Sequence, residues 1–260
     1  MDEPYLTQFR NILRAGGGAR DIHDASEAVG YATDCVCSDR FIEAEILGVA
    51  QRQRSLCPIL ERFVGPVDRI IDVGCCTGAA TVATALSPVL RPREVVGVDP
   101  NKMSLSAAWV RANGYGLAPD RVNFVYTPAD QPLPFADRDF DVALCVSVLE
   151  FVTSPTGRRN FIEQLKRVTK PGGYVYLTTP NPLRVREYHS GRLFEDFRRR
   201  DGFPWASTRR AILSHFRGWE SVDLSEFVVR NRLNVGALAR LAPLMRWSFT
   251  WQKLLLRRPV

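Results

Sequence analysis

A glycine-containing turn between an apolar segment and an alanine-rich segment constrains the fold of this chain more than any other feature. The stretch Arg69-Ile-Ile-Asp-Val-Gly-Cys-Cys-Thr-Gly78 is followed by Ala79-Ala-Thr-Val-Ala-Thr-Ala-Leu86. Ile70, Ile71 and Val73 predict the end of a buried strand, and the alanine-rich segment predicts a helix. Such a turn puts free backbone N–H groups and a positive helix end at the carboxyl edge of a sheet. Nucleotide-like ligands bind at this edge in open α/β folds.

A second predicted strand ends in an acid at the distance expected for ribose recognition. That acid is expected about 20 residues after the glycine turn, and Glu94-Val-Val-Gly-Val-Asp99 places Asp99 twenty-one residues after Gly78. The charge of Asp72 then distinguishes a dinucleotide site from a site for a ligand with an ammonium group. A nicotinamide site has three glycines, as G-x-G-x-x-G, packed under a pyrophosphate. A carboxylate at Asp72 would repel a pyrophosphate but attract the ammonium group of a bound amino acid.

The first motif and three later segments resemble one enzyme family. Asp72-Val-Gly-Cys-Cys-Thr-Gly78 resembles the first motif of class I S-adenosylmethionine-dependent methyltransferases, with Cys76 where the family most often has its middle glycine. The later segments resemble the family's LPF…FD run, its S-x-L-E-H-V segment, and the end of the fifth strand in quinone-type and related small-molecule methyltransferases. They are Leu133-Pro-Phe-Ala-Asp-Arg-Asp-Phe-Asp-Val142, Ser147-Val-Leu-Glu-Phe-Val152, and Lys170-Pro-Gly-Gly173 followed by Thr179-Pro-Asn-Pro182. The resemblance covers roughly residues 65 to 225.

Strand and helix patterns alternate from Arg69 onward, which predicts an α/β fold. We expect a Rossmann-like, doubly wound, mostly parallel sheet of seven strands with an N-terminal helical cap and a C-terminal basic helix. The predicted strands are 69–73, 94–98, 121–126, 140–146, 173–179, 218–224 and 227–229. The predicted helices within this region are 78–87, 101–113, 156–169 and 208–216.

Three parts are predicted along the chain. Residues 1–64 carry helical spacing around 5–13 and 38–63 and form a helical cap. This cap is either a lid over the site, as the resemblance implies, or two packing helices. Residues 65–232 form the S-adenosylmethionine-binding methyltransferase domain, and residues 233–260 form a basic amphipathic tail.

The resemblance implies how S-adenosylmethionine is held. Asp72 would bind the methionine ammonium, directly or through water, and Asp99 would accept hydrogen bonds from the ribose hydroxyls. In the alternative, Asp72 is only a strand-end acid, and Asp99 to Asn101 form only a turn and a helix cap. The expected cofactor-binding residues are Asp72, Gly74, Cys75, Gly78, Asp99, Pro100, Asn101, Asp130 and Ser147.

The adenine contact departs from the family pattern. Counting back from Leu133 puts Ala129 where the family has an aspartate, with Asp130 next to it. Either the loop is shifted by one residue and Asp130 binds the adenine amino group, or the contact is made by another group. We favour Asp130.

Two residues are candidates for acid–base catalysis. Phe151 occupies the histidine position of the S-x-L-E-H-V segment, so a base carried over from that position is absent. Glu150 remains beside the expected cofactor edge. His189 follows Thr179-Pro-Asn-Pro182 in a predicted loop over the acceptor side and is the preferred general base. The alternative for His189 is a solvated loop histidine.

The composition indicates a globular protein in a reducing compartment. Hydrophobic residues make up 45% of the chain and charged residues 24%, and we expect no signal peptide and no membrane span. The six cysteines lack C-x-x-C spacing, which favours reduced thiols, no metal site and a cytoplasmic location.

The net charge of +7 arises entirely after Glu226, where seven basic residues occur and no acid. Within 243–258, Arg246, Lys253 and Arg257 recur at helical spacing beside tryptophans and leucines. This pattern predicts an interfacial helix on an anionic membrane surface. The alternative is a terminal helix packed on its own core or on a dimer partner.

These observations predict a methyltransferase acting on an O or C centre of a small, hydrophobic acceptor, such as a prenylated quinone or another lipid. An RNA methyltransferase and a non-catalytic S-adenosylmethionine-binding regulatory protein are the alternatives. Nucleic acid is the less favoured partner, because acids partly cancel the arginines of 184–210 and no Asn-Pro-Pro-Tyr motif occurs.

Overall fold

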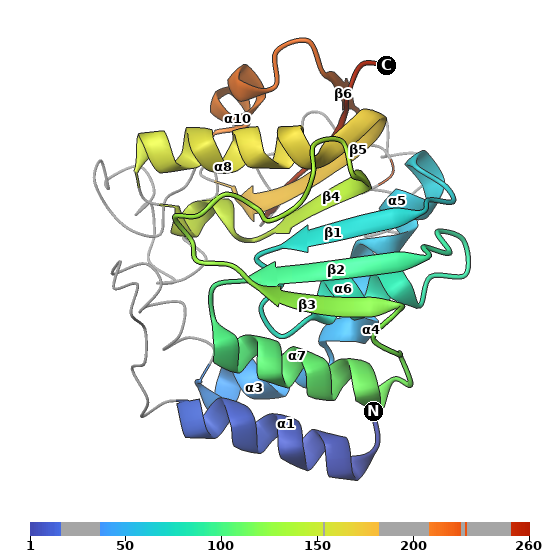
Figure 1. The fold of residues 1–260 in the computed structure, drawn as a ribbon, viewed down its shortest axis with the longest axis vertical. Helices are drawn as coiled ribbons and strands as arrows, with labels where there is room; N and C mark the ends of the chain where they lie inside the picture. Colours follow the sequence, from blue (N-terminus) through green and yellow to red (C-terminus); the bar gives the residue numbers. More distant parts are fainter. Residues whose placement is uncertain (17–36, 153, 182–207, 225–226, 228–250) are drawn as a thin grey trace.

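A single seven-stranded sheet forms the centre of the computed structural model, which describes residues 1–16, 37–152, 154–181, 208–224, 227 and 251–260. The strand order is β3-β2-β1-β4-β5-β7-β6 (Figure 1). The strands are β1 (Arg69–Val73), β2 (Glu94–Asp99), β3 (Val122–Tyr126), β4 (Phe140–Val146), β5 (Thr169–Pro180), β6 (Glu220–Val222) and β7 (Trp251–Arg257). The prediction of a mostly parallel, seven-stranded α/β sheet is confirmed.

Strands β1 to β5 are parallel, and their carboxyl ends therefore meet at one edge. β1 lies between β2 and β4, and Asp72 is in register with Gly97 on one side and Leu144 on the other. β2 pairs with β3, and β4 pairs with β5. Figure 1 shows the arrowheads of these strands together on the left of the view. This shared edge brings the ends of four predicted motifs together.

Helices cover both faces of the sheet. One apolar cluster joins α5 (Cys57–Phe63), α6 (Ala79–Ala85) and α7 (Lys102–Gly114) to strand residues such as Ile70 and Leu144. The other joins α8 (Pro155–Val168) and α10 (Arg209–His215) to alternate residues of the same strands, such as Ile71 and Ala143. Both faces of the central strands are thus buried, as expected for a doubly wound sheet.

The N-terminal segment folds into several helices rather than two. They are α1 (Glu3–Gly16), α3 (Asp39–Ile46), α4 (Gly48–Ser55) and α5 (Cys57–Phe63). The run predicted as one helix over 38–63 is interrupted at Leu47 and Leu56. In Figure 1, α1 and α3 lie beside α7, on its side away from the strands, and α4 packs against α6. The role of residues 1–64 as a lid stays a prediction.

The prediction of a C-terminal helix is wrong for Trp251–Arg257, which form β7. β7 runs antiparallel between β5 and β6, and Leu254, Leu255 and Leu256 are all buried. These leucines face the two apolar clusters and therefore cannot face lipid. The described sheet has β7 as its remaining strand, and the predicted strand at 227–229 lies outside the described residues except for Phe227. Residues 228–250 lie outside the described residues, so the boundary at residue 233 stays a prediction there.

Among the described helices, none combines the length and the apolar character that crossing a bilayer requires. The longest described helices, α1 and α8, have 14 residues each and carry charged side chains.

Candidate functional site

The turn after β1 has a backbone that only glycine adopts readily at two positions. Gly74 and Gly78 have φ angles of 76° and 74°. A Cβ on Gly74 would lie 2.4 Å from a methyl group of Val148, and a Cβ on Gly78 would lie 2.9 Å from the Phe124 ring. Cys76 has a φ of 50°, in the left-handed region that favours glycine. This conformation agrees with its place in the motif, where the resembling family most often has a glycine.

The expectation of free N–H groups in this turn is wrong for four of its residues. The N–H groups of Gly74 and Cys75 both donate to the carbonyl of Val98, and that of Gly78 donates to the carbonyl of Cys75. The N–H of Cys76 donates to Asp99 Oδ2 at 2.8 Å. A pyrophosphate site needs such donors for its own oxygens. The turn is therefore unsuited to a dinucleotide pyrophosphate.

Asp72, the next-to-last residue of β1, is fully buried, and one of its carboxylate oxygens has no described hydrogen-bond partner. Its Oδ2 accepts a hydrogen bond from Thr81 Oγ1 at 2.7 Å. Its Oδ1 has no hydrogen-bond partner among the described residues. Burial raises the pKa of Asp72 to about 6, while the Thr81 hydrogen bond and the charge of Arg52 oppose the rise. The free oxygen is available to a cationic donor.

Asp99, the last residue of β2, accepts hydrogen bonds both from the glycine turn and from the segment that follows β2. Its Oδ2 accepts from the N–H of Cys76, and its Oδ1 accepts from the N–H of Asn101 at 2.9 Å. Burial raises its pKa to about 6, against the two backbone hydrogen bonds. A carboxylate has about four acceptor positions, so two remain. Asn101 caps α7, accepting from the N–H of Ser104, so the predicted helix cap is present.

Glu150 is buried at the end of β4, in a short 3-10 helix, η1 (Leu149–Phe151). Neither of its carboxylate oxygens has a hydrogen-bond partner in the described part of the chain. Burial raises the pKa of Glu150 to about 8. The Thr179 side chain in β5 lies beside Glu150 and opposes the rise of its pKa, and the Thr127 hydroxyl after β3 is likewise buried without a described partner. Because buried polar atoms are nearly always paired, these atoms mark places for polar ligand groups or water.

The structure brings most of the predicted site residues to this one edge. Ser147 follows β4 with a φ of 61°, and its N–H donates to the carbonyl of Thr178 in β5. Pro100 follows β2 directly. Asp130 lies exposed in the segment after β3, where Thr127 hydrogen-bonds the backbone of Asp99. His189 lies outside the described residues.

Arg52 of α4 is a candidate site residue that sequence reasoning missed. Its charge acts on both Asp72 and Tyr176, which share one row across the sheet through Leu144. Its Nε is buried without a hydrogen-bond partner in the regions that the structure describes. The sequence signal is weak, because Arg52 lies in a helix with several other polar residues and approaches Asp72 only in the folded chain.

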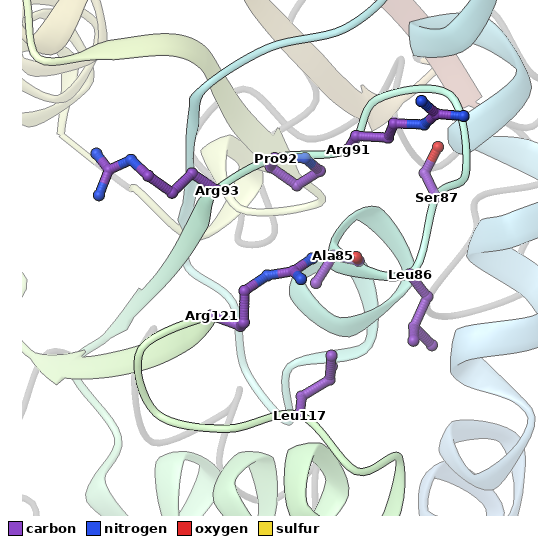
Figure 2. Close-up of a pocket in the computed structure, with 8 residues that line it drawn as sticks. All are labelled: Ala85, Leu86, Ser87, Arg91, Pro92, Arg93, Leu117 and Arg121. Carbon is purple, nitrogen blue, oxygen red and sulfur yellow. Dashed lines mark hydrogen bonds between the residues drawn. The ribbon is translucent and has the colours of Figure 1, made fainter.

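A hollow of about 640 Å³ lies at the opposite edge of the sheet, where β2 and β3 begin (Figure 2). Figure 2 shows Arg121 directed toward Ala85 and Arg93 directed away from the hollow, and Arg93 forms an ion pair with Asp68. None of the predicted site residues lines it. The candidate functional site is therefore the carboxyl edge, where the buried acids gather.

Comparison with known proteins agrees with this geometry. Residues 71–177 match a family model described as a methyltransferase domain. An uncharacterized methyltransferase of Schizosaccharomyces pombe is 32% identical over 122 residues, which are 44% of this chain and 40% of the relative. A ubiquinone biosynthesis O-methyltransferase of Leptothrix cholodnii is 30% identical over 124 residues, covering 47% of this chain and 49% of the relative. The chain thus spans less than half the length of these curated relatives.

The fold also occurs in solved structures. A SAM-dependent methyltransferase from Aquifex aeolicus has a TM-score of 0.52 and 17% identity, covering 70% of this chain and 89% of that structure. At this identity the likeness shows the fold alone. By the family match, residues 71–177 form a methyltransferase domain, and the solved structure shares its Rossmann-like α/β fold.

Proposed function

We propose that this chain is an S-adenosylmethionine-dependent methyltransferase that acts on an O or C centre of a small, hydrophobic acceptor. One observation carries the proposal. Asp72 and Asp99 are buried at the ends of adjacent parallel strands, on either side of a glycine turn, and Asp72 keeps one oxygen without a described partner. This arrangement suits a ligand with an ammonium group and a ribose, and it does not suit a pyrophosphate.

The donor is assigned to residues of this chain by charge and hydrogen-bonding capacity. Asp72 Oδ1 would accept from the methionine ammonium. Asp99 would accept from the ribose hydroxyls with its two remaining acceptor positions. Gly74, Cys75 and Gly78 would let the backbone approach the donor closely.

Residues outside the first two motifs complete the predicted donor site. Ser147, Pro100 and Asn101 line the same edge, and Asp130 remains the proposed adenine contact. Cys76 supports this assignment, because its N–H donates a hydrogen bond to Asp99, the acid proposed to bind the ribose. This bond fixes the position of the turn relative to the proposed ribose site.

Arg52 supplies a positive charge that could pair with the negative carboxylate of the donor. The amino-acid part of S-adenosylmethionine is a zwitterion, and Arg52 brings a positive charge near the negative Asp72. We propose that Asp72 binds the ammonium and Arg52 the carboxylate. In this arrangement each charge of the ligand meets an opposite charge of the protein.

Positioning supplies much of the rate in such a site. When bound, S-adenosylmethionine supplies a methyl group whose bond to sulfur breaks with the electron pair returning to sulfur, while a new bond forms to the acceptor atom. Holding two reacting groups at attack distance contributes about 7–11 kcal/mol. Gripping the donor at the ends of β1 and β2 fixes it relative to the ends of β4 and β5.

Glu150 is the proposed proton acceptor among the described residues. Its pKa of about 8 is close to neutral pH, where a general base works best. His189, for which the structure gives no position, stays the alternative base.

The relatives favour a small-molecule acceptor. The Leptothrix cholodnii relative is described as a ubiquinone biosynthesis O-methyltransferase, so a phenolic or quinol hydroxyl is the first acceptor class to test. Deprotonation of such a hydroxyl in the active site would give the nucleophile that methyl transfer needs.

The proposal is tested by incubating the protein with methyl-labelled S-adenosylmethionine and a cell extract divided into lipid, small-molecule and RNA fractions. Label in the small-molecule or lipid fraction supports it, and label in RNA alone supports the rival RNA methyltransferase. If the donor binds and no fraction takes label, the non-catalytic regulatory protein is supported instead.

Once an acceptor is found, Glu150→Gln distinguishes the two candidate bases. Gln keeps the size of the side chain and removes its basic carboxylate, so turnover should fall by about 10²–10⁴-fold if Glu150 is the base. Donor affinity, measured by calorimetry, should change little. Normal turnover in Glu150→Gln together with a loss in His189→Ala would transfer the role to His189.

A further inference from the structure

A buried polar cluster lies on the side of the glycine turn that faces the N-terminal helices. Its members are Glu45 of α3, Thr77 of the turn and Arg111 of α7. The hydroxyl of Thr77 donates to Glu45 Oε2. Arg111 Nη2 donates to Thr77 Oγ1 at 3.0 Å, to Glu45 Oε2 at 3.2 Å and to the Glu45 carbonyl at 2.9 Å. The three residues therefore form one connected network.

Two members of the network, Thr77 and Arg111, are fully buried, and Glu45 is mostly buried. Arg111 is 1% exposed and Thr77 is 0% exposed. The guanidinium of Arg111 also lies 4.7 Å from the ring centroid of Phe9 in α1. A Cβ on Gly48 of α4 would lie 3.0 Å from Arg111 Nη1 and 3.0 Å from Ala79. The cluster thus joins α1, α3, α4 and α7 at the first turn of α6.

Glu45 is the described acid that compensates the buried charge of Arg111. If α3 moved away, Arg111 would lose both its carboxylate partner and the carbonyl of the same residue. A buried charge without its partner is strongly unfavourable. The position of α3 and the conformation of Arg111 are therefore linked.

Thr77 transmits this link to the proposed donor site. It stands between Cys76, whose N–H is bound to Asp99, and Gly78, the N-cap of α6, which has a positive φ. A displacement of Thr77 would shift both neighbours, and with them the two contacts that shape the turn. The side chain of Thr77 is bound to Glu45 and Arg111, whereas the backbone of the turn faces the carboxyl edge of the sheet.

We propose that Glu45, Thr77 and Arg111 are positioning residues that couple the N-terminal helices to the donor-binding turn. Donor binding and the docking of α1 and α3 then stabilise each other, because coupling between two sites is reciprocal. This inference rests on the proposed function, since it assumes that the donor occupies the turn. It adds a role for residues 1–64 that does not require them to touch the donor.

Hydrogen exchange of the full chain tests the coupling, with S-adenosylhomocysteine as the probe. In the unmodified protein, saturating probe should slow amide exchange in 3–16 and 39–46. Thr77→Val removes the hydroxyl at nearly constant volume and should remove this slowing, even at concentrations that saturate the variant. Its affinity for the probe should fall by about fivefold or more, the range of ordinary coupling between sites.

Thr84→Val is the matched control. Thr84 is a buried threonine of α6 whose hydroxyl, among the described residues, donates to the α6 carbonyls of Ala80 and Thr81 alone. This variant loses one buried hydroxyl of the same kind but no link to α3, so its N-terminal helices should still respond to the probe. Thr77→Ser keeps the hydroxyl and should restore the response. If Thr77→Val does not fold, Glu45→Gln takes its place, and its response should be weakened.

The outcomes separate this inference from the proposed function. If the unmodified protein binds the probe but 3–16 and 39–46 do not respond, the coupling is overturned and the proposed function stands. The same holds if Thr77→Val responds like the unmodified protein. If the unmodified protein does not bind the probe, the proposed function falls, and the coupling falls with it.

Discussion

At the scale of single residues, burial sets the chemistry of the acids at the sheet edge. Asp72, Asp99 and Glu150 are each at most 8% exposed, and burial raises the pKa of all three. Asp72 and Glu150 keep oxygens without described partners, whereas Asp99 is held by two backbone N–H groups. The first two are therefore suited to bind a ligand or accept a proton, and Asp99 also shapes the turn.

The raised pKa of Asp72 predicts that donor affinity depends on pH. Above a pH of about 6 Asp72 is ionised in the free protein and attracts the ammonium group of the donor. Below that pH it holds a proton, which must leave before the ion pair forms. Affinity for S-adenosylhomocysteine should therefore be constant above pH 7. Below pH 6, affinity should fall as the pH falls. For each proton that binding must release, the fall is at most about tenfold per pH unit.

Calorimetry from pH 5 to pH 8 measures this dependence, and Asp72→Asn is the control. Asn cannot ionise, so the variant should bind weakly at every pH and keep only the part of the dependence that comes from Asp99. An unmodified protein whose affinity is unchanged down to pH 5 would contradict the assignment of Asp72 to the ammonium.

At the scale of secondary-structure elements, β7 is the strand that completes the sheet. It pairs with β5 along its whole length and with β6 on its other side. Arg258, just after it, donates from Nη1 to the carbonyl of Lys166 at 2.8 Å and so holds the end of α8. Lys253 donates from Nζ to the carbonyl of Ser55. β7 therefore links the helices of both faces.

The position of β7 predicts a large effect of one core substitution. Leu255 is 0% exposed and belongs to the apolar cluster that contains Leu144 and Tyr176. Leu255→Ala should lower the free energy of unfolding by about 2–5 kcal/mol, because it removes buried apolar volume and leaves a cavity. Chemical denaturation followed by circular dichroism measures the change.

Leu47→Ala is the matched control, because Leu47 is 60% exposed and the same change there should stay within about 0.5 kcal/mol. If Leu255→Ala were equally neutral, residues 251–257 would not form an inner strand in solution. The interfacial-helix prediction for this segment would then regain support.

At the scale of the whole molecule, the two edges of the sheet have different characters. The carboxyl edge gathers buried acids and buried hydroxyls without described partners. The amino edge has the hollow of about 640 Å³ with three arginines at its border (Figure 2). Because the strands are parallel, every strand end that carries site chemistry is brought to the same side.

A ligand at the carboxyl edge should stabilise the whole domain, because it binds the ends of several strands and only the folded chain. S-adenosylhomocysteine at one hundred times its Kd should add about 2.7 kcal/mol. For a chain of this size each kcal/mol raises the Tm by about 2–4 °C. Thermal denaturation should therefore show a rise of roughly 5–11 °C.

Adenosine and methionine, added separately, are the controls. Each carries only part of the recognised groups and should raise the Tm much less than S-adenosylhomocysteine at the same concentration. An equal rise with all three would show that the ligand is not gripped by Asp72 and Asp99 together.

Local patterns were enough to predict the parallel part of the sheet and its first helices. Strands β1 to β4 lie within one residue of the predicted ranges, because each buried strand is an apolar run bounded by a turn. The glycine turn, Asp72 and Asp99 were also recognisable, since two positive φ angles and two strand-end acids depend on residues that are close in sequence.

Contacts between distant segments decided the rest. Leu254 to Leu256 are buried on both faces of β7, and a continuous apolar run has no alternation that separates a strand from a helix. The approach of Arg52 to Asp72, and of Glu45 and Arg111 to Thr77, joins helices to a turn tens of residues away. Whether Asp72 and Glu150 would be buried without partners was equally hidden, because burial depends on which elements pack over a residue and not on its neighbours in the chain.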